Sequence, residues 1–158
     1  MFLTASRFRV FEPAAGRRLA LPVFLSRVAA GFPSPAEDFA DGTLDLNDLI
    51  EHPAATFIVR VSGSSMTGAG IFDGDLLIVD RSLTPRTGQI VVAVQAGGMT
   101  VKRLRRRAGR WWLFPEVQDA TDGDTGDGDT GPGGVAAMEM TEDSEIWGVV
   151  KNVVRCLS

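Results

Sequence analysis

Short apolar runs, separated by turns that contain glycine, dominate the chain from residue 57 to residue 154. The runs are rich in Val, Ile, Leu and Trp and are four to nine residues long, which is typical of β-strands rather than helices. Asp73-Gly74-Asp75 and Ala96-Gly97-Gly98 are two of the turns between them. The pattern predicts strands at 57–62, 76–80, 89–95, 99–105, 111–114, 135–140 and 146–154. We therefore expect a mainly β fold, built as a compact, partly closed, barrel-like domain.

Residues 1–30 show no such periodicity, because Pro13, Gly16 and Pro22 interrupt them. We expect an extended, mobile N-terminal arm joined to a β domain at 31–158. The arm carries five arginines and one glutamate, a net charge of +4, whereas the rest of the chain carries −8. Separating the arm from the domain would change the electrostatic field of both parts.

A second interpretation of the arm stays open. Arg17-Arg18, the apolar residues 19–25 and the small residues Val28-Ala29-Ala30 resemble the three zones of a secretory signal peptide, and an Arg-rich transit peptide has a related composition. Against this, the apolar zone is only seven residues long, and Arg27 lies just before the expected cut. A secreted β domain is therefore an alternative, not the preferred interpretation.

Two short helices and one loop complete the predicted elements. Ser34-Pro35 supplies an N-cap and a first-turn proline for a helix at 36–39, and 44–50 is a second helical candidate. Residues 119–134 read DATDGDTGDGDTGPGG, whose carboxylates suggest calcium. An EF-hand that starts at Asp122 would need glycine in its sixth position, where Asp127 stands. We expect a flexible, solvated loop instead.

The candidate chemistry begins with Ser65, in Val61-Ser-Gly-Ser-Ser-Met66 between the strand at 57–62 and a turn at 68–70. A hydroxyl at such a break stands clear of the sheet, and the neighbouring backbone N–H groups are free to face a carbonyl oxygen. Serine is a weak nucleophile at its ordinary pKa, so a base must lie within hydrogen-bond reach. Taken alone, Ser65 is equally typical of an ordinary turn.

The base is expected to be Lys102. The single histidine, His52, stands in Glu-His-Pro before the first strand of the domain, and the chain has only two lysines, Lys102 and Lys151. Along a strand Lys102 shares its face with Thr100 and Leu104 and leaves the neighbouring arginines on the other face. To act at neutral pH its pKa must fall by roughly 3 units, about 4–5 kcal/mol, which burial against apolar groups such as Leu104 and Met66 supplies. Taken alone, a solvated strand lysine is the competing interpretation.

Little in the sequence supports a metal site, a cofactor site or a membrane span. Cys156 has no cysteine partner, and one cysteine with one histidine does not make the usual zinc site, so we expect no metal, no cofactor and a reducing, cytoplasmic setting. No apolar run approaches the ~20 residues of a membrane span.

Six basic residues in 102–110 suggest a nucleic-acid binding site. They lack interleaved aromatic residues and also protect a strand edge, so little direct DNA binding is expected. One of Trp111 and Trp112 should face the core.

Four motifs together resemble one known family. They are Ser-Gly-Ser-Ser-Met at 62–66, Gly-Asp-Leu-Leu-Ile-Val-Asp at 74–80, Gly-Gln-Ile-Val-Val-Ala at 88–93 and Thr-Val-Lys at 100–102. They resemble the signature of the LexA/UmuD family of self-cleaving Ser-Lys peptidases, and the separation of Ser65 and Lys102 is similar to that of the family. The resemblance covers residues 22–114 and resumes near residue 146. The loop at 119–134 departs from the family, whose connection is usually shorter.

The resemblance implies a function. It identifies Ser65 and Lys102 as catalytic, with the backbone N–H groups of Ser64 and Ser65 as oxyanion donors. Ala30-Gly31-Phe-Pro-Ser-Pro35 is similar to the cleavage sequence of the SOS mutagenesis members, which are cut before the glycine, so Ala30 and Gly31 would flank the scissile bond. Ala30 is small enough to enter a narrow cleft, and residues 28–29 would add to a sheet edge as a strand.

The resemblance also implies partners: a second copy of the chain, a RecA filament on single-stranded DNA that stimulates cleavage, and a UmuC-type error-prone polymerase that binds the shortened form in translesion synthesis. Residues 1–30 have no room for a helix-turn-helix module, so an operator-binding repressor is not expected. Two alternatives remain. One is a non-catalytic polymerase-binding adaptor with a vestigial dyad, and the other is a LexA-like self-cleaving regulator without its DNA-binding module.

Overall fold

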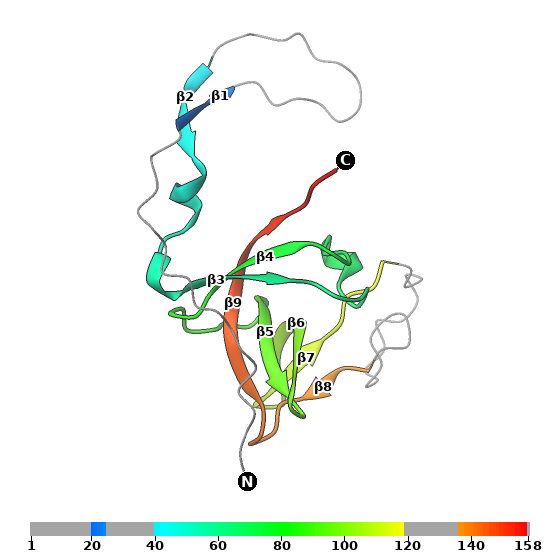
Figure 1. The fold of residues 1–158 in the computed structure, drawn as a ribbon. Coiled ribbons are helices and arrows are strands. Elements are labelled where there is room, and N and C mark those ends of the chain that lie inside the picture. The colour runs from blue at the N-terminus through cyan, green and yellow to red at the C-terminus, as the bar shows by residue number, and fades with distance from the viewer. Residues whose placement is uncertain (1–19, 25–39, 119–135, 158) are drawn as a thin grey trace. The chain divides into compact units, whose positions relative to one another are not determined.

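The computed structural model describes residues 20–24, 40–118 and 136–157 (Figure 1). The chain divides into two units, Met1–Ala54 and Ala55–Ser158. The predicted boundary at 30/31, the helix at 36–39 and the loop at 119–134 lie outside the described residues and stay predictions. Among the residues that are described, no helix has the length and apolar character to cross a membrane.

The first unit contains a two-stranded antiparallel hairpin of β1 (Ala20–Phe24) and β2 (Ala40–Asp45), followed by the 3₁₀ turn η1 (Leu46–Leu49). The predicted helix at 44–50 is therefore wrong in its first half and reduced to one turn in its second. Asp45 explains the change, because its carboxylate accepts the N–H of Asn47 at 2.9 Å and so caps a turn where β2 ends. Strand β1 lies inside the predicted arm, where no periodicity indicated it.

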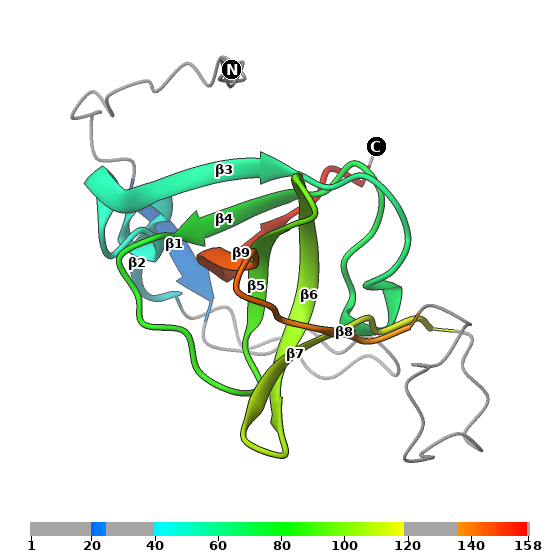
Figure 2. The same cartoon turned by 90° about the horizontal axis from the view of Figure 1, so that it is seen from below.

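The second unit is one antiparallel sheet of seven strands in the order β3-β4-β9-β5-β6-β7-β8 (Figures 1 and 2). Six predicted strands agree with it to within two residues at each end. Of the described residues of the seventh, 136–140, only the two of β8 form a strand. The mainly β fold class is confirmed. The strands are β3 (Thr56–Arg60), β4 (Leu76–Asp80), β5 (Ile90–Gln95), β6 (Gly98–Arg107), β7 (Arg110–Phe114), β8 (Met138–Glu139) and β9 (Glu145–Val154), with 3₁₀ turns η2 (Pro53–Ala55) and η3 (Thr67–Ala69).

Strand β9 makes the sheet bend. Its first half pairs with β5 and its second half with β4, and both ladders contain a register shift. Figures 1 and 2 show β3 and β4 running across the direction of β5 and β6. Gly148 lies at the crossing, where an added Cβ would stand 2.6 Å from Cγ1 of Val79. Glycine is required there because the strands approach too closely for a side chain.

The bend lets apolar residues pack on both sides of β5. A first core cluster contains Val92, and a second contains its neighbour Val91, whose side chain points to the opposite face. The first cluster is Val61, Met66, Ile71, Leu77, Val79 and Val92. The second is Val91, Ala93, Leu104, Leu113 and Val149, with Trp111 packed against it as the alternation along its strand predicts. Between them these clusters hold β6 and the turn after β3 in place.

Candidate active site

Ser65 lies in the turn that follows β3, and three contacts fix this turn. Asp73 accepts the N–H of Gly63 at 2.8 Å, the carbonyl of Ser65 accepts the N–H of Glu116 at 2.8 Å, and Gly68 donates to the Glu116 carbonyl at 2.8 Å. Met66, next to Ser65, is 2% exposed in the first core cluster. The turn is thus anchored on each side of Ser65, whose own side chain is only half-buried.

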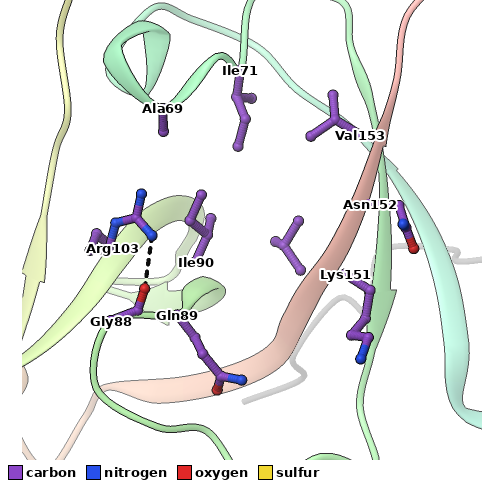
Figure 3. A pocket seen from close by; sticks show the side chains of 10 residues that line it. Ala69, Ile71, Gly88, Gln89, Ile90, Arg103, Lys151, Asn152 and Val153 are labelled. Carbon is purple, nitrogen blue, oxygen red and sulfur yellow. Dashed lines mark hydrogen bonds between the residues drawn. The ribbon is translucent and has the colours of Figure 1, made fainter. Parts of the chain in front are cut away.

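Lys102 lies in the middle of β6, directly across from Val91 of β5. Its side chain points to the same face as Leu104, which belongs to the second core cluster, and the residue is only 6% exposed. The predicted alternation along β6 is confirmed, because Arg103 points to the other face. Figure 3 shows this opposite side, where Arg103 and Ile90 line a surface pocket of about 230 Å³ between β5, β9 and η3.

The structure brings Ser65 and Lys102 together. Nζ of Lys102 lies 2.7 Å from Oγ of Ser65, and it lies 3.1 Å from Oγ1 of Thr100 and 3.1 Å from the carbonyl oxygen of Val101. An ammonium has three N–H donors for these three oxygens. A neutral amine has two, for Thr100 and Val101, and one lone pair that accepts the Ser65 hydroxyl. The same geometry therefore suits both protonation states.

Burial lowers the pKa of Lys102 from its ordinary value. Within the described ranges no carboxylate pairs with the Lys102 amine, so no negative charge opposes this effect. Arginine at this position would stay charged, since a guanidinium does not deprotonate in proteins. The environment is the one that a lysine needs in order to act as a general base.

The structure describes some of the remaining predicted site residues and not others. The backbone N–H groups of Ser64 and Ser65 donate to no acceptor in residues 20–24, 40–118 and 136–157, and their role as oxyanion donors stays a prediction. Ala30 and Gly31 lie outside the described residues. His52 is exposed, as is the free thiol of Cys156. In the same described part of the chain, no three His, Cys, Asp or Glu side chains gather as a metal site.

Sequence reasoning missed two residues that contact the Ser65 turn. Asp73 and Glu116 hold Gly63 and Ser65 through the hydrogen bonds above, yet they come from a loop before β4 and from the segment after β7. No periodicity marks them, since both lie in irregular segments. Strand alternation correctly predicts the face of Thr100 but does not predict its contact with the Lys102 amine.

The chain is similar to known proteins over most of its length. Residues 22–126 match the family described as "Peptidase S24-like". The chain is similar to Protein MucA of Salmonella typhimurium, with 42% identity over 144 residues that cover 89% of each protein. It is 50% identical to Protein ImpA of Escherichia coli over 100 residues, which are 63% of this chain and 69% of ImpA. It is also 45% identical over 108 residues to the LexA repressor of Acidithiobacillus ferrooxidans strain ATCC 53993, covering 67% of this chain and 52% of the repressor.

Proposed function

The chain belongs to the S24-like peptidase family, and we propose that it is a serine peptidase that cuts itself between Ala30 and Gly31 with Ser65 as nucleophile and Lys102 as general base. The contact of 2.7 Å between a buried lysine amine and a serine hydroxyl carries this proposal. A surface lysine would stay protonated at neutral pH and would hold no lone pair for the serine proton.

The proposed reaction has two stages. Neutral Lys102 takes the Ser65 proton while Oγ attacks the carbonyl carbon of Ala30, and the N–H groups of Ser64 and Ser65 stabilise the resulting oxyanion. The C–N bond to Gly31 then breaks, and the Lys102 ammonium gives its proton to the leaving amine. Ser65 is left as an ester of Ala30. In the second stage Lys102 deprotonates a water that attacks this ester. The bond between the carbonyl carbon and Oγ breaks, the Lys102 ammonium returns its proton to Oγ, and the Ala30 carboxyl group is released.

The proposed setting is the SOS response. Similarity to ImpA, MucA and a LexA repressor supports a self-cleaving accessory protein of SOS mutagenesis, of the UmuD type. In this proposal a RecA filament on single-stranded DNA accelerates cleavage, and the shortened chain, as a homodimer, joins a UmuC-type polymerase. A monomeric mass in solution at micromolar concentration would contradict the dimer, and a cleavage rate unchanged by the filament would contradict the regulation.

The decisive experiment is the intact mass of the purified chain after incubation at about pH 10, because burial lowers the pKa of Lys102 and high pH favours its neutral amine. Wild type should yield a fragment that begins at Gly31, and Ser65→Ala and Lys102→Ala should stay whole. If wild type also stays whole, with or without activated RecA filament, the chain is a non-catalytic adaptor instead. Cleavage of all three chains alike would identify a contaminating protease and would oblige a repeat with freshly purified protein.

A further inference from the structure

Resting on the proposed function, we infer that the ion pair of Arg103 with Glu116 positions Ser65 against Lys102. Neither residue touches the reacting hydroxyl or the lysine amine in the described structure, so both are positioning residues rather than catalytic ones. The inference is built from hydrogen bonds that lead from the Ser65 turn through Glu116 back to β6.

Glu116 holds the nucleophile turn through its backbone. Its N–H donates to the carbonyl of Ser65 and its carbonyl accepts the N–H of Gly68, both at 2.8 Å. The two bonds form a short bridge between the turn and the segment that follows β7. Next along the chain, the N–H of Gln118 donates to Oγ1 of Thr67 at 3.1 Å. Displacement of Glu116 would therefore carry the Ser65 backbone with it.

The same residue is held to β6 through its side chain. Nε and Nη2 of Arg103 donate to the two carboxylate oxygens of Glu116 at 2.8 and 2.7 Å, which is the planar, two-point geometry that favours arginine. Nη1 of Arg103 also donates to the Gly88 carbonyl at 2.8 Å, drawn as the dashed line in Figure 3. These hydrogen bonds raise the pKa of Arg103 and are the main cause of the lowered pKa of Glu116, to which the charge of Arg105 at 3.5 Å also contributes, so both partners are charged at neutral pH.

The contacts close a loop around the dyad. Lys102 and Arg103 are consecutive in β6, and they point to opposite faces. Lys102 reaches the hydroxyl of Ser65, while Arg103 holds Glu116, whose N–H binds the carbonyl of the same serine. The hydroxyl and the carbonyl of Ser65 are therefore both positioned, directly or through Glu116, by two consecutive residues of β6. An ion pair with this placement sets the distance between nucleophile and base.

Packing at Gly68 shows how closely the two segments meet. A Cβ added to Gly68 would lie 3.2 Å from the backbone carbons of Glu116 and Val117. That separation is shorter than ordinary van der Waals contact, so the segment after β7 has little room to slide along the turn. A change at Glu116 is therefore passed to Ser65 rather than absorbed locally.

The chain offers a matched control one hairpin away. Arg110 of β7 pairs with Glu139 of β8 at 2.6 Å, again an arginine with a glutamate. The exposed fractions of its two side chains are 72% and 32%, against 26% and 23% for Arg103 and Glu116. Within the described ranges, no hydrogen bond of Arg110 or Glu139 reaches the Ser65 turn. Loss of this pair should cost little and leave the dyad in place.

The experiment compares self-cleavage rates as a function of pH for the full chain, Glu116→Gln, Arg103→Gln, Arg103→Lys and the control Glu139→Gln. A misplacement of the nucleophile by about 1 Å lowers a rate up to about a hundredfold. We expect Glu116→Gln and Arg103→Gln to lower the high-pH rate about tenfold to a hundredfold, and Arg103→Lys to lose less of the rate than Arg103→Gln. In Glu116→Gln and Arg103→Gln the midpoint of the curve of rate against pH should move to higher pH, because a loosened turn lets water reach Lys102 and the pKa of this lysine rises. Glu139→Gln should change neither quantity.

A second readout does not depend on cleavage. In chains that carry Ser65→Ala, ¹³C labelling of lysine gives signals from only two residues, Lys102 and the reference Lys151. Adding Glu116→Gln should raise the pKa of Lys102, and the Lys151 signal serves as the internal reference. Ser65→Ala keeps the backbone carbonyl to which Glu116 donates, so the positioning contact is still present. If Glu116→Gln does not fold, Arg103→Lys is measured in its place.

The outcomes separate the two proposals. If wild type cleaves but Glu116→Gln keeps the midpoint and rate of the control, the positioning role is overturned and the proposed function stands. If wild type never cleaves but the Lys102 titration shifts in Glu116→Gln, the positioning stands and the proposed function fails. A loss of thermal stability that is equal in Glu116→Gln and Glu139→Gln, with no shift of the Lys102 midpoint, identifies a purely structural ion pair and also overturns the inference.

Discussion

The Lys102 amine nitrogen lies 2.7 Å from the hydroxyl oxygen of Ser65, although 37 positions separate the two residues in the chain. β6 supplies the lysine and the turn after β3 supplies the serine. Each residue is ordinary by itself. Together, in a buried setting without a described carboxylate beside the amine, they have the arrangement of a nucleophile with its base.

Cleavage should become faster as pH rises through the pKa of Lys102 in the folded protein, and then level off. Below that pKa the amine is protonated and has no lone pair for the Ser65 proton. Because burial lowers the pKa, the rise should be centred below the value of about 10.4 for a free lysine. Initial rates of fragment formation between about pH 6 and pH 11 measure this curve. A rate that is independent of pH over that range would contradict Lys102 as the base.

Lys102→Arg should abolish cleavage even at high pH. The guanidinium keeps its proton, and its larger fork does not fit the space of a buried amine that contacts three oxygens. Lys151→Arg is the matched control, since it changes the only other lysine, on β9, and should cleave like wild type. Intact mass measures cleavage of both variants. Equal cleavage would show that Lys102 is not the general base.

Replacement of Lys102 by methionine should remove activity and yet stabilise the fold. Burial depresses the pKa of the folded lysine, so the unfolded chain binds its proton more tightly, and stability increases as pH rises from the folded pKa toward the unfolded one. At neutral pH the free-energy cost of burying the lysine amine lowers the stability of wild type, and this cost is absent in Lys102→Met. We expect a gain on the order of 1 kcal/mol, or a melting temperature about 2–4 °C higher. The difference between the two chains should shrink in alkaline buffer, and a lower melting temperature for Lys102→Met at neutral pH would count against this account.

Thr100→Val should slow cleavage about tenfold at high pH. The hydroxyl of Thr100 accepts one N–H of Lys102 at 3.1 Å, which turns the amine lone pair toward Ser65. Loss of this acceptor also removes a group that favours the ammonium, so the midpoint of the pH curve should move to lower pH. Thr100→Ser keeps the oxygen and should behave like wild type. Identical curves for Val and Ser at this position would show that the contact is unimportant.

Asp75 should make the fold more resistant to acid. Arg155 donates to both of its carboxylate oxygens at 2.6 and 2.5 Å, and these hydrogen bonds are the main cause of a pKa lowered from 3.8 to about 2. The stabilisation is complete above the unfolded pKa and is lost as pH falls from about 3.8 to about 2. Asp75→Asn should lose this part of the pH dependence of the melting temperature. Asp143→Asn, at an exposed turn, is the control and should keep it.

Gly148→Ala should destabilise the fold by about 1–3 kcal/mol, because the new methyl group overlaps Val79 where β9 crosses β4. Gly98→Ala is the control: the nearest atom to its added Cβ is 3.8 Å away, and its effect should stay within about 0.5 kcal/mol. Denaturant unfolding measures both. Combining Gly148→Ala with Val79→Ala should recover part of the loss, and an additive double variant would contradict the steric explanation.

Strand positions were largely readable from local pattern. The apolar run 76–80 is β4 to the residue, and the alternation around Lys102 correctly predicts that this lysine and Leu104 share one face, with Arg103 opposite. The pattern failed at 44–50, where a side-chain cap ends a strand with a single 3₁₀ turn. It also failed at β1, whose pairing with β2 has no signature in the composition of the arm.

The candidate residues, the strands that carry them and the faces they take are predictable from the sequence, because they follow from local chemistry and from a side-chain period of two. Tertiary structure alone decided the rest. The bend of β9, the burial of Lys102, and the bridge from Arg103 through Glu116 to Ser65 join segments that no local pattern relates. Such contacts form only when several strands have packed, since their geometry depends on the crossing of the sheet rather than on any one stretch of chain.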